Sequence, residues 1–144
     1  MSTTPLTFCL DLHRAEARLR LRLDDVLGTL HGIGWDDFAL LATLVEHGGR
    51  LPLRELADHL ATPLSVLLRR LAPLEKTGLL ARVSSDVGTR DVVLRTSGRR
   101  VQHVAAQTAR LACEAATWDL RADALAAAAD VVDGVARADA ASPA

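Results

Sequence analysis

Apolar residues recur along most of this chain at steps of three and four, the spacing of amphipathic helices. The first such run covers residues 6–30, and a glycine-containing break separates it from a second run that starts near Trp35. Asp36 and Asp37 fall in the first turn of the second run, where the helix dipole favours acidic side chains. The pattern therefore predicts two N-terminal helices.

The middle of the chain predicts two shorter helices joined by a turn. Residues 53–60 form a two-turn amphipathic pattern, which Ala61 closes. Thr62 is a suitable N-cap and Pro63 a suitable first residue for the next helix, and Gly78 ends that helix in the position after its C-cap. This is the order of a helix-turn-helix.

A β-hairpin is expected next. Two short runs rich in valine and leucine, residues 79–84 and 91–95, flank the polar residues 85–90, which predict a flexible tip. Residues 50–52 could supply a short strand that pairs with this hairpin. A helix-turn-helix followed by a hairpin predicts a winged helix-turn-helix.

Two further helices should follow the hairpin. Thr96 or Ser97 would cap the first, over residues 98–116, and an alanine-rich run from 120 to about 137 predicts the second. The apolar stripe of this last helix is expected to consist of Leu120, Leu125, Ala128, Val132 and Val135.

Composition and charge refine this picture. Two Trp and two Phe are the only aromatic residues besides histidine, so leucine, valine and alanine must build the core, which favours helices packed on helices. The predicted fold class is mainly α with a small β-hairpin wing.

The net charge is −1, yet residues 50–103 carry ten Arg or Lys against five acids, while both flanks are acidic. This asymmetry points to a polyanionic partner for the middle segment.

The second helix of the helix-turn-helix has a polar face that suits DNA. On a helical wheel, Ser65, Arg69 and Lys76 lie together opposite a row of leucines. Their hydroxyl, guanidinium and ammonium groups suit contacts with bases and phosphates in a major groove. Arg90, on the hairpin, could enter the adjacent minor groove. Contacts to phosphate are expected from Arg54, Arg70 and Arg82. A solvated amphipathic helix would show the same polar face.

One segment carries the residues that are most specific to a known protein family. It begins at Glu55-Leu56-Ala57, runs through Leu60, Ser65, Arg69 and Leu74-Glu75, and ends at Gly78-Leu79-Leu80 and Arg82. With Trp35–Leu41 before it and Leu94…Gly98 after it, the chain resembles the MarR family of winged-helix transcriptional regulators over nearly its whole length. The resemblance implies a homodimer that carries two winged helices to a pseudo-palindromic DNA operator. It divides the chain into an N-terminal dimerisation helix (1–34), a DNA-binding region (35–97), C-terminal dimerisation helices (98–138) and a disordered tail (139–144).

Three places depart from the family pattern. Leu68 stands where the family usually has Thr or Ser, and Pro73 lies inside the recognition helix, where it removes the hydrogen bond to the Arg69 carbonyl and should kink the helix. The hairpin is a residue or two short, and its Asp86 and Arg90 are four apart, whereas the family has Asp-x-Arg. These departures keep a second hypothesis open, in which the winged helix binds protein instead of DNA.

The resemblance also implies a binding site for a small-molecule effector. The residues that could contact this effector are His13, Trp35, Phe38 and His103. Trp35 and Phe38 could equally be ordinary core residues. Cys9 lies where peroxide-sensing members carry a reactive cysteine, but those sensors use Tyr hydroxyls, and this chain has no Tyr. A buried structural role is therefore the default expectation for both Cys9 and Cys113.

No enzyme, cofactor or metal motif accompanies these features. Phosphate-binding glycine loops, nucleophile elbows and HExxH motifs are absent from the sequence, and Cys9 and His13 have no further cluster of metal ligands nearby. The sequence has no signal peptide or transmembrane pattern, so a cytoplasmic location is expected. The favoured hypothesis is a dimeric DNA-binding regulator, a repressor released by its effector.

Overall fold

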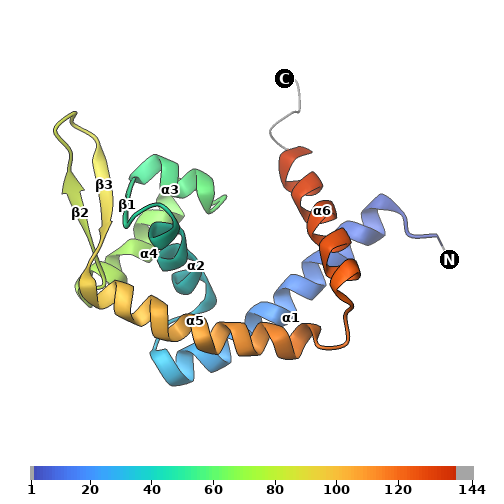
Figure 1. The fold of residues 1–144 in the computed structure, drawn as a ribbon. Helices are drawn as coiled ribbons and strands as arrows, with labels where there is room; N and C mark the ends of the chain where they lie inside the picture. Colours follow the sequence, from blue (N-terminus) through green and yellow to red (C-terminus); the bar gives the residue numbers. More distant parts are fainter. Residues whose placement is uncertain (1, 139–144) are drawn as a thin grey trace. The chain divides into compact units, whose positions relative to one another are not determined.

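The computed structural model describes residues 2–138, so the tail predicted at 139–144 lies outside the described residues. These residues form two compact units, one up to Ala112 and the other from Cys113. They contain six helices and three strands (Figure 1), which confirms a mainly α fold with a small β wing. The bounds are α1 Pro5–His31, α2 Trp35–Glu46, β1 Arg50–Pro52, α3 Leu53–His59, α4 Leu64–Lys76, β2 Leu80–Ser84, β3 Arg90–Leu94, α5 Thr96–Thr117 and α6 Ala122–Ala138.

The first two helices begin and end at local signals in the sequence. The Thr4 side chain caps α1 by accepting a hydrogen bond from the Thr7 backbone N–H at 3.2 Å, and Gly32 ends this helix in a left-handed conformation with φ of 69°. The Asp37 carboxylate accepts a hydrogen bond from the Gly34 N–H at the start of α2. Asp24 of α1 accepts another from the Trp35 N–H at 2.7 Å, which fixes α2 against α1.

Leucines fill the core of the first unit, as the lack of aromatic residues predicted. The helices α1 to α4 bury leucines completely, and strands β2 and β3 each add one apolar residue. Burying each of these side chains contributes roughly 1.5–3 kcal/mol. The fully buried side chains are Leu23, Leu27, Leu40, Leu41, Leu44, Leu56, Leu67, Leu71, Leu80 and Val92.

The turn between α3 and α4 differs from the prediction by one residue. Ala61 takes a left-handed conformation with φ of 47°, and the Thr62 hydroxyl donates to the Leu60 carbonyl. Thr62 therefore does not cap α4. Pro63 is the N-cap, because its ψ of 142° is extended, and α4 begins at Leu64.

The other end of α4 is as predicted. Gly78 has φ of 80°, and its N–H donates to the Glu75 carbonyl at 3.0 Å. The Leu79 N–H donates to the Leu74 carbonyl at 3.0 Å. This pair of bonds is a Schellman motif, which turns the chain directly from α4 into the hairpin.

The three strands form an antiparallel sheet in the order β1-β3-β2, which confirms that residues 50–52 pair with the hairpin. Leu51 lies opposite Val92, and both are buried. Ser85 and Thr89 close the tip through their hydroxyls, 2.6 Å apart, and through a 2.7 Å backbone bond from the Ser85 N–H to the Thr89 carbonyl. The hairpin therefore has a short, hydrogen-bonded end.

Helix α5 begins earlier than expected. Thr96 is already helical, so neither Thr96 nor Ser97 is its cap. The Ser97 hydroxyl instead donates to the Gly78 carbonyl at 2.6 Å. This bond joins the start of α5 to the residues that follow α4, and Gly98 is buried at the same junction.

The second unit contains α6, whose apolar side chains remain exposed. Leu125, Val131, Val132 and Val135 are each between 40% and 49% exposed, and Leu120 precedes the helix. The predicted helix is therefore confirmed, while its apolar stripe is not buried within the chain.

None of the helices in residues 2–138 is both long enough and apolar enough to cross a membrane.

Candidate nucleic-acid interface

Helix α4 separates its residues into a buried and an exposed face. Leu67 and Leu71 are fully buried. Ser65, Arg69 and Lys76 are exposed on the other side, as the helical wheel predicted. Neither cation forms a salt bridge to a carboxylate among the described residues, so both are available to an external anion.

The two unusual residues of α4 lie within this helix without ending it. Leu68 is half-buried, so part of its apolar side chain is exposed beside Arg69. Pro73 is exposed, and the helix continues past it to Lys76, where the Thr77 N–H donates to the Pro73 carbonyl at 3.0 Å. The predicted kink stays a prediction.

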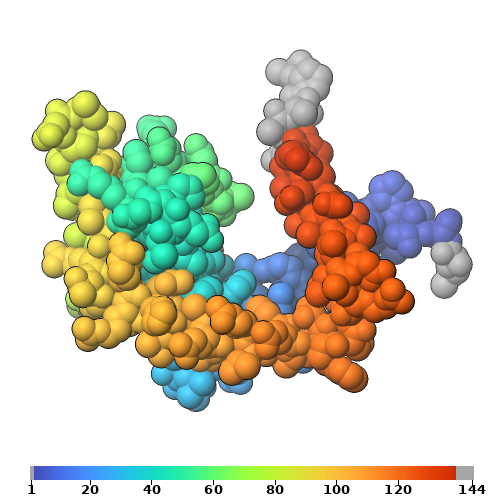
Figure 2. All heavy atoms as spheres, viewed as in Figure 1, coloured from blue at the N-terminus to red at the C-terminus, as the bar shows by residue number. Residues whose placement is uncertain are grey.

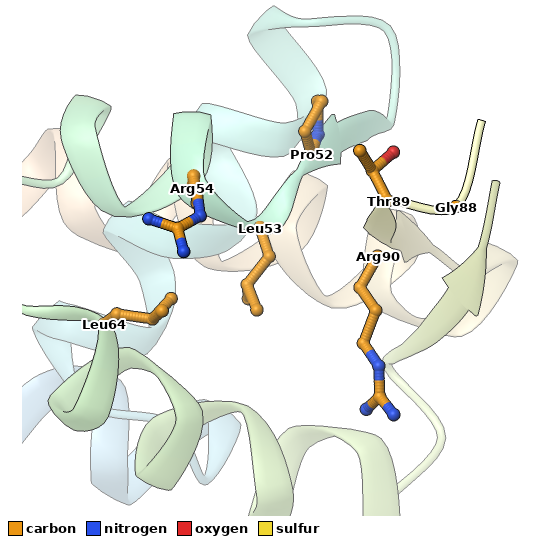
Figure 3. A pocket seen from close by; sticks show the side chains of 7 residues that line it. All are labelled: Pro52, Leu53, Arg54, Leu64, Gly88, Thr89 and Arg90. Carbon is orange, nitrogen blue, oxygen red and sulfur yellow. The ribbon is translucent and has the colours of Figure 1, made fainter.

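A groove lies between α3, the start of α4 and the hairpin. It has a volume of about 360 Å³, and Leu53 and Leu64 give it an apolar lining. Arg54 and Arg90 extend from opposite sides of Leu53 (Figure 3). In the space-filling view the hairpin stands beside α3 (Figure 2), so the groove is open to solvent. Two arginines beside an apolar lining suit the phosphates and sugars of a nucleic-acid backbone.

Arg90 lies in a different place from the one expected. It is the first residue of β3 and pairs with Ser84, so it belongs to the strand and not to the polar tip. Its side chain is exposed. The cation is therefore held on an ordered strand at the rim of the groove.

Two of the arginines proposed to contact phosphate already have carboxylate partners. Arg70 of α4 lies 3.1 Å from Asp36 of α2, and Arg82 of β2 donates to Glu75 at 2.7 Å. Asp36 also binds Arg20 of α1 at 2.5 Å. Hydrogen bonds from Arg20 to Asp36 and then to Glu16 raise the pKa of the Arg20 guanidinium. Asp36 thus links α4 to α1. The expected contacts of Arg70 and Arg82 with phosphate stay predictions, and they would have to compete with these carboxylates.

Sequence reasoning did not find the ion pair between β1 and the start of β3. Asp91 is 7% exposed and accepts a hydrogen bond from the Arg50 Nε at 2.7 Å, which links β3 to β1. The other carboxylate oxygen of Asp91 is buried and has no partner among the described residues. The one available signal was an acid within an apolar strand, next to Val92, and it does not identify Arg50 as the partner. This pair fixes the strand on which Arg90 lies.

The four residues expected to contact an effector lie in different surroundings. His13 is exposed on α1, while Trp35 and Phe38 are half-buried and stack on each other with ring centroids 5.5 Å apart. His103 lines a separate groove of about 480 Å³ on α5, which contains none of the other three. A shared site for these residues stays a prediction.

Cys9 is exposed, so the expectation that both cysteines are buried is wrong for this one. Its neighbours Leu6 and Leu10 are exposed as well, because this part of α1 has no helix packed against that side within its own unit. Cys113 is half-buried, and burial raises the pKa of its thiol.

No family model matches this sequence, and no curated protein matches it either. The chain is, however, similar to solved structures. A MarR family transcriptional regulator from Streptomyces coelicolor, in complex with DNA, has a TM-score of 0.86 at 23% identity and covers 96% of this chain and 89% of its own. The chain has the MarR-type winged-helix fold.

Two further MarR structures fit the same architecture. A mutant MarR from E. coli, complexed with operator DNA, has a TM-score of 0.78 at 22% identity and covers 86% of this chain and 89% of its own. CouR from Rhodococcus jostii, bound to p-coumaroyl-CoA, has a TM-score of 0.79 at 17% identity, with 87% and 88% covered. In this MarR-type fold α3 and α4 form the helix-turn-helix and β2–β3 the hairpin that follows it, as the sequence predicted.

Proposed function

We propose that this protein is a MarR-type transcriptional regulator that binds double-stranded DNA in the cytoplasm. The observation that carries the proposal is the exposed row of Ser65, Arg69 and Lys76 on α4, whose cations have no internal partner among the described residues. Two MarR structures of the same fold were solved with DNA. They support this function for the row.

The residues divide into those that read bases and those that contact the backbone. Arg69 can donate two hydrogen bonds to a guanine edge, and the Ser65 hydroxyl can donate to or accept from either strand. Lys76 and Arg54 supply charge to phosphates, and Arg90 reaches from the wing toward the minor groove. Leu68, beside Arg69, suits contact with a thymine methyl group.

This assignment predicts binding that weakens steeply with salt, because each phosphate contact releases a counterion from the DNA. The measurement is fluorescence anisotropy with a duplex from the promoter region of the protein's own gene, at several salt concentrations. Arg90→Ala should reduce the salt slope by about one and lower affinity while keeping sequence preference. Salt-insensitive binding, or none, would contradict the proposal.

We also propose a homodimer on a pseudo-palindromic operator, in which residues 1–34 and 98–138 form the interface. Leu21 and Leu30 of α1 are 74% and 66% exposed, and Leu111 of α5 is 67% exposed. The apolar side chains on one side of α6 are exposed as well. Exposed apolar side chains on these helices support a protein interface. A small-molecule effector that releases a repressor would bind close to such an interface.

Val132→Asp tests the dimer, because a charge placed in an apolar interface without a partner is strongly destabilising. Sedimentation velocity should give the mass of two chains for the wild type and of one chain for the variant. Asp130→Asn on the same helix is the control and should leave the dimer intact. A wild type that sediments as one chain at micromolar concentration would exclude the dimer.

A winged helix that binds protein instead of DNA is the second candidate, and the half-buried Leu68 on the recognition face favours it. The same anisotropy measurement separates the two candidates. A protein-binding module would bind the promoter duplex no better than a duplex of scrambled sequence.

A further inference from the structure

Two histidines that are far apart in the sequence meet at one edge of the winged helix. His47 follows the last residue of α2, and His59 is the last residue of α3. Their ring centroids are 4.3 Å apart, and the ring planes are inclined by 42°. Both side chains are exposed, so an ion from solution can reach them.

A hydrogen bond sets the tautomer of His47. Its Nδ1 lies 2.8 Å from the Thr43 carbonyl oxygen, which can only accept, so Nδ1 carries the proton. Neutral His47 therefore presents the lone pair of Nε2. Metal-binding histidines are commonly held in this way, with the second ring nitrogen donating to a backbone carbonyl.

The local electrostatics also favour a cation. His47 and His59 lie at the C-terminal ends of α2 and α3, where the helix dipoles leave negative partial charge. The residues immediately before them, Glu46 and Asp58, are acidic and exposed. The nearest basic residues in sequence are Arg50, which is paired with Asp91, and Arg54, in the first turn of α3.

We propose that His47 and His59 form a binding site for a divalent cation that prefers imidazole: Zn²⁺, Ni²⁺ or Cu²⁺. In residues 2–138 no group of three or more His, Cys, Asp or Glu side chains could hold a metal, so water completes the coordination. Mg²⁺ and Ca²⁺ do not suit this site, because they require oxygen ligands.

A cation at this site would connect the end of α2 to the end of α3. Between these points lie β1 and the whole of α3, which carries Arg54. The bound ion would thus close residues 47–59 into a loop and stabilise the folded winged helix by mass action. The site lies outside the DNA-contacting row and does not depend on the proposed function.

The test is isothermal titration calorimetry with ZnCl₂ and NiCl₂ on the full chain, with thermal unfolding measured in parallel. The wild type should bind one ion per chain, and its Tm should rise as the metal concentration rises. His47→Ala and His59→Ala should each lower the affinity at least about tenfold and remove the rise in Tm. His103→Ala, an exposed histidine on α5, is the matched control and should behave as the wild type.

A second readout locates the ion directly. Substoichiometric Cu²⁺ should broaden the imidazole proton resonances of His47 and His59 in an NMR spectrum before it affects His13 or His103. Absence of binding by the wild type would overturn the proposal. Equal binding by the His47→Ala/His59→Ala double variant would do the same, because the ion would then occupy another site.

Discussion

Arg69→Ala is expected to weaken binding to the operator by about 1–3 kcal/mol and to relax specificity at one base position. Arg69 lies near the middle of the exposed face of α4 and has no carboxylate partner among the described residues, so its guanidinium is free to bind a base edge. Anisotropy titrations should compare the operator with a series of duplexes, each carrying one changed base pair.

The control for this variant is Arg95→Ala, which removes the same charge from an exposed position between β3 and α5. It should leave both affinity and base preference unchanged, apart from a small electrostatic effect. If Arg69→Ala lowered affinity equally for every duplex in the series, Arg69 would be a phosphate contact, and base reading would have to come from other residues.

Gly98→Ala is expected to lower the free energy of unfolding by about 3 kcal/mol. An ideal Cβ on Gly98 would overlap the Leu79 carbonyl oxygen and lie 2.8 Å from Leu94 Cδ1. A backbone carbonyl cannot rotate away as a side chain can, so α5 would have to move off the junction between α4 and β2. Equilibrium unfolding in urea, followed by circular dichroism, measures the change.

Gly28→Ala is the matched control, since a Cβ there has no atom within 4 Å in the described structure. It lies inside α1, so alanine should stabilise the helix by about 0.5–1 kcal/mol. Unfolding of Gly98→Ala at the same urea concentration as the wild type would show that the junction is looser than its geometry indicates.

Much of the fold followed from periodic patterns, because each helix buries one side against a neighbour. The buried face of α4 was predicted for this reason. Gly78 was predicted after the C-cap because glycine readily adopts the left-handed conformation that ends a helix. The starts of α4 and α5 were predicted wrongly, because the hydroxyls of Thr62 and Ser97 bond elsewhere: to the preceding turn and to the Gly78 carbonyl. In the sequence alone, a Thr or Ser hydroxyl near the start of a helix has several equivalent hydrogen-bond partners. Tertiary packing decides which of them it bonds.

The candidate interface was predictable only in part, for a similar reason. A helical wheel places Ser65, Arg69 and Lys76 on the exposed face without knowledge of the rest of the chain. It cannot show that Arg70 is paired with Asp36, which is distant in sequence and lies on α2. The meeting of His47 with His59 likewise depends on how β1 and α3 fold between them.

Lys76 is the single lysine of the sequence, since every other basic residue apart from histidine is arginine. It is exposed in the last turn of α4, the helix proposed to contact DNA. Apart from the terminal amine, a reagent selective for primary amines would therefore modify this helix alone. Lysine acylation thus provides a site-specific chemical handle on the recognition surface without any engineered residue, and the same reaction in a cell would remove one positive charge from that surface.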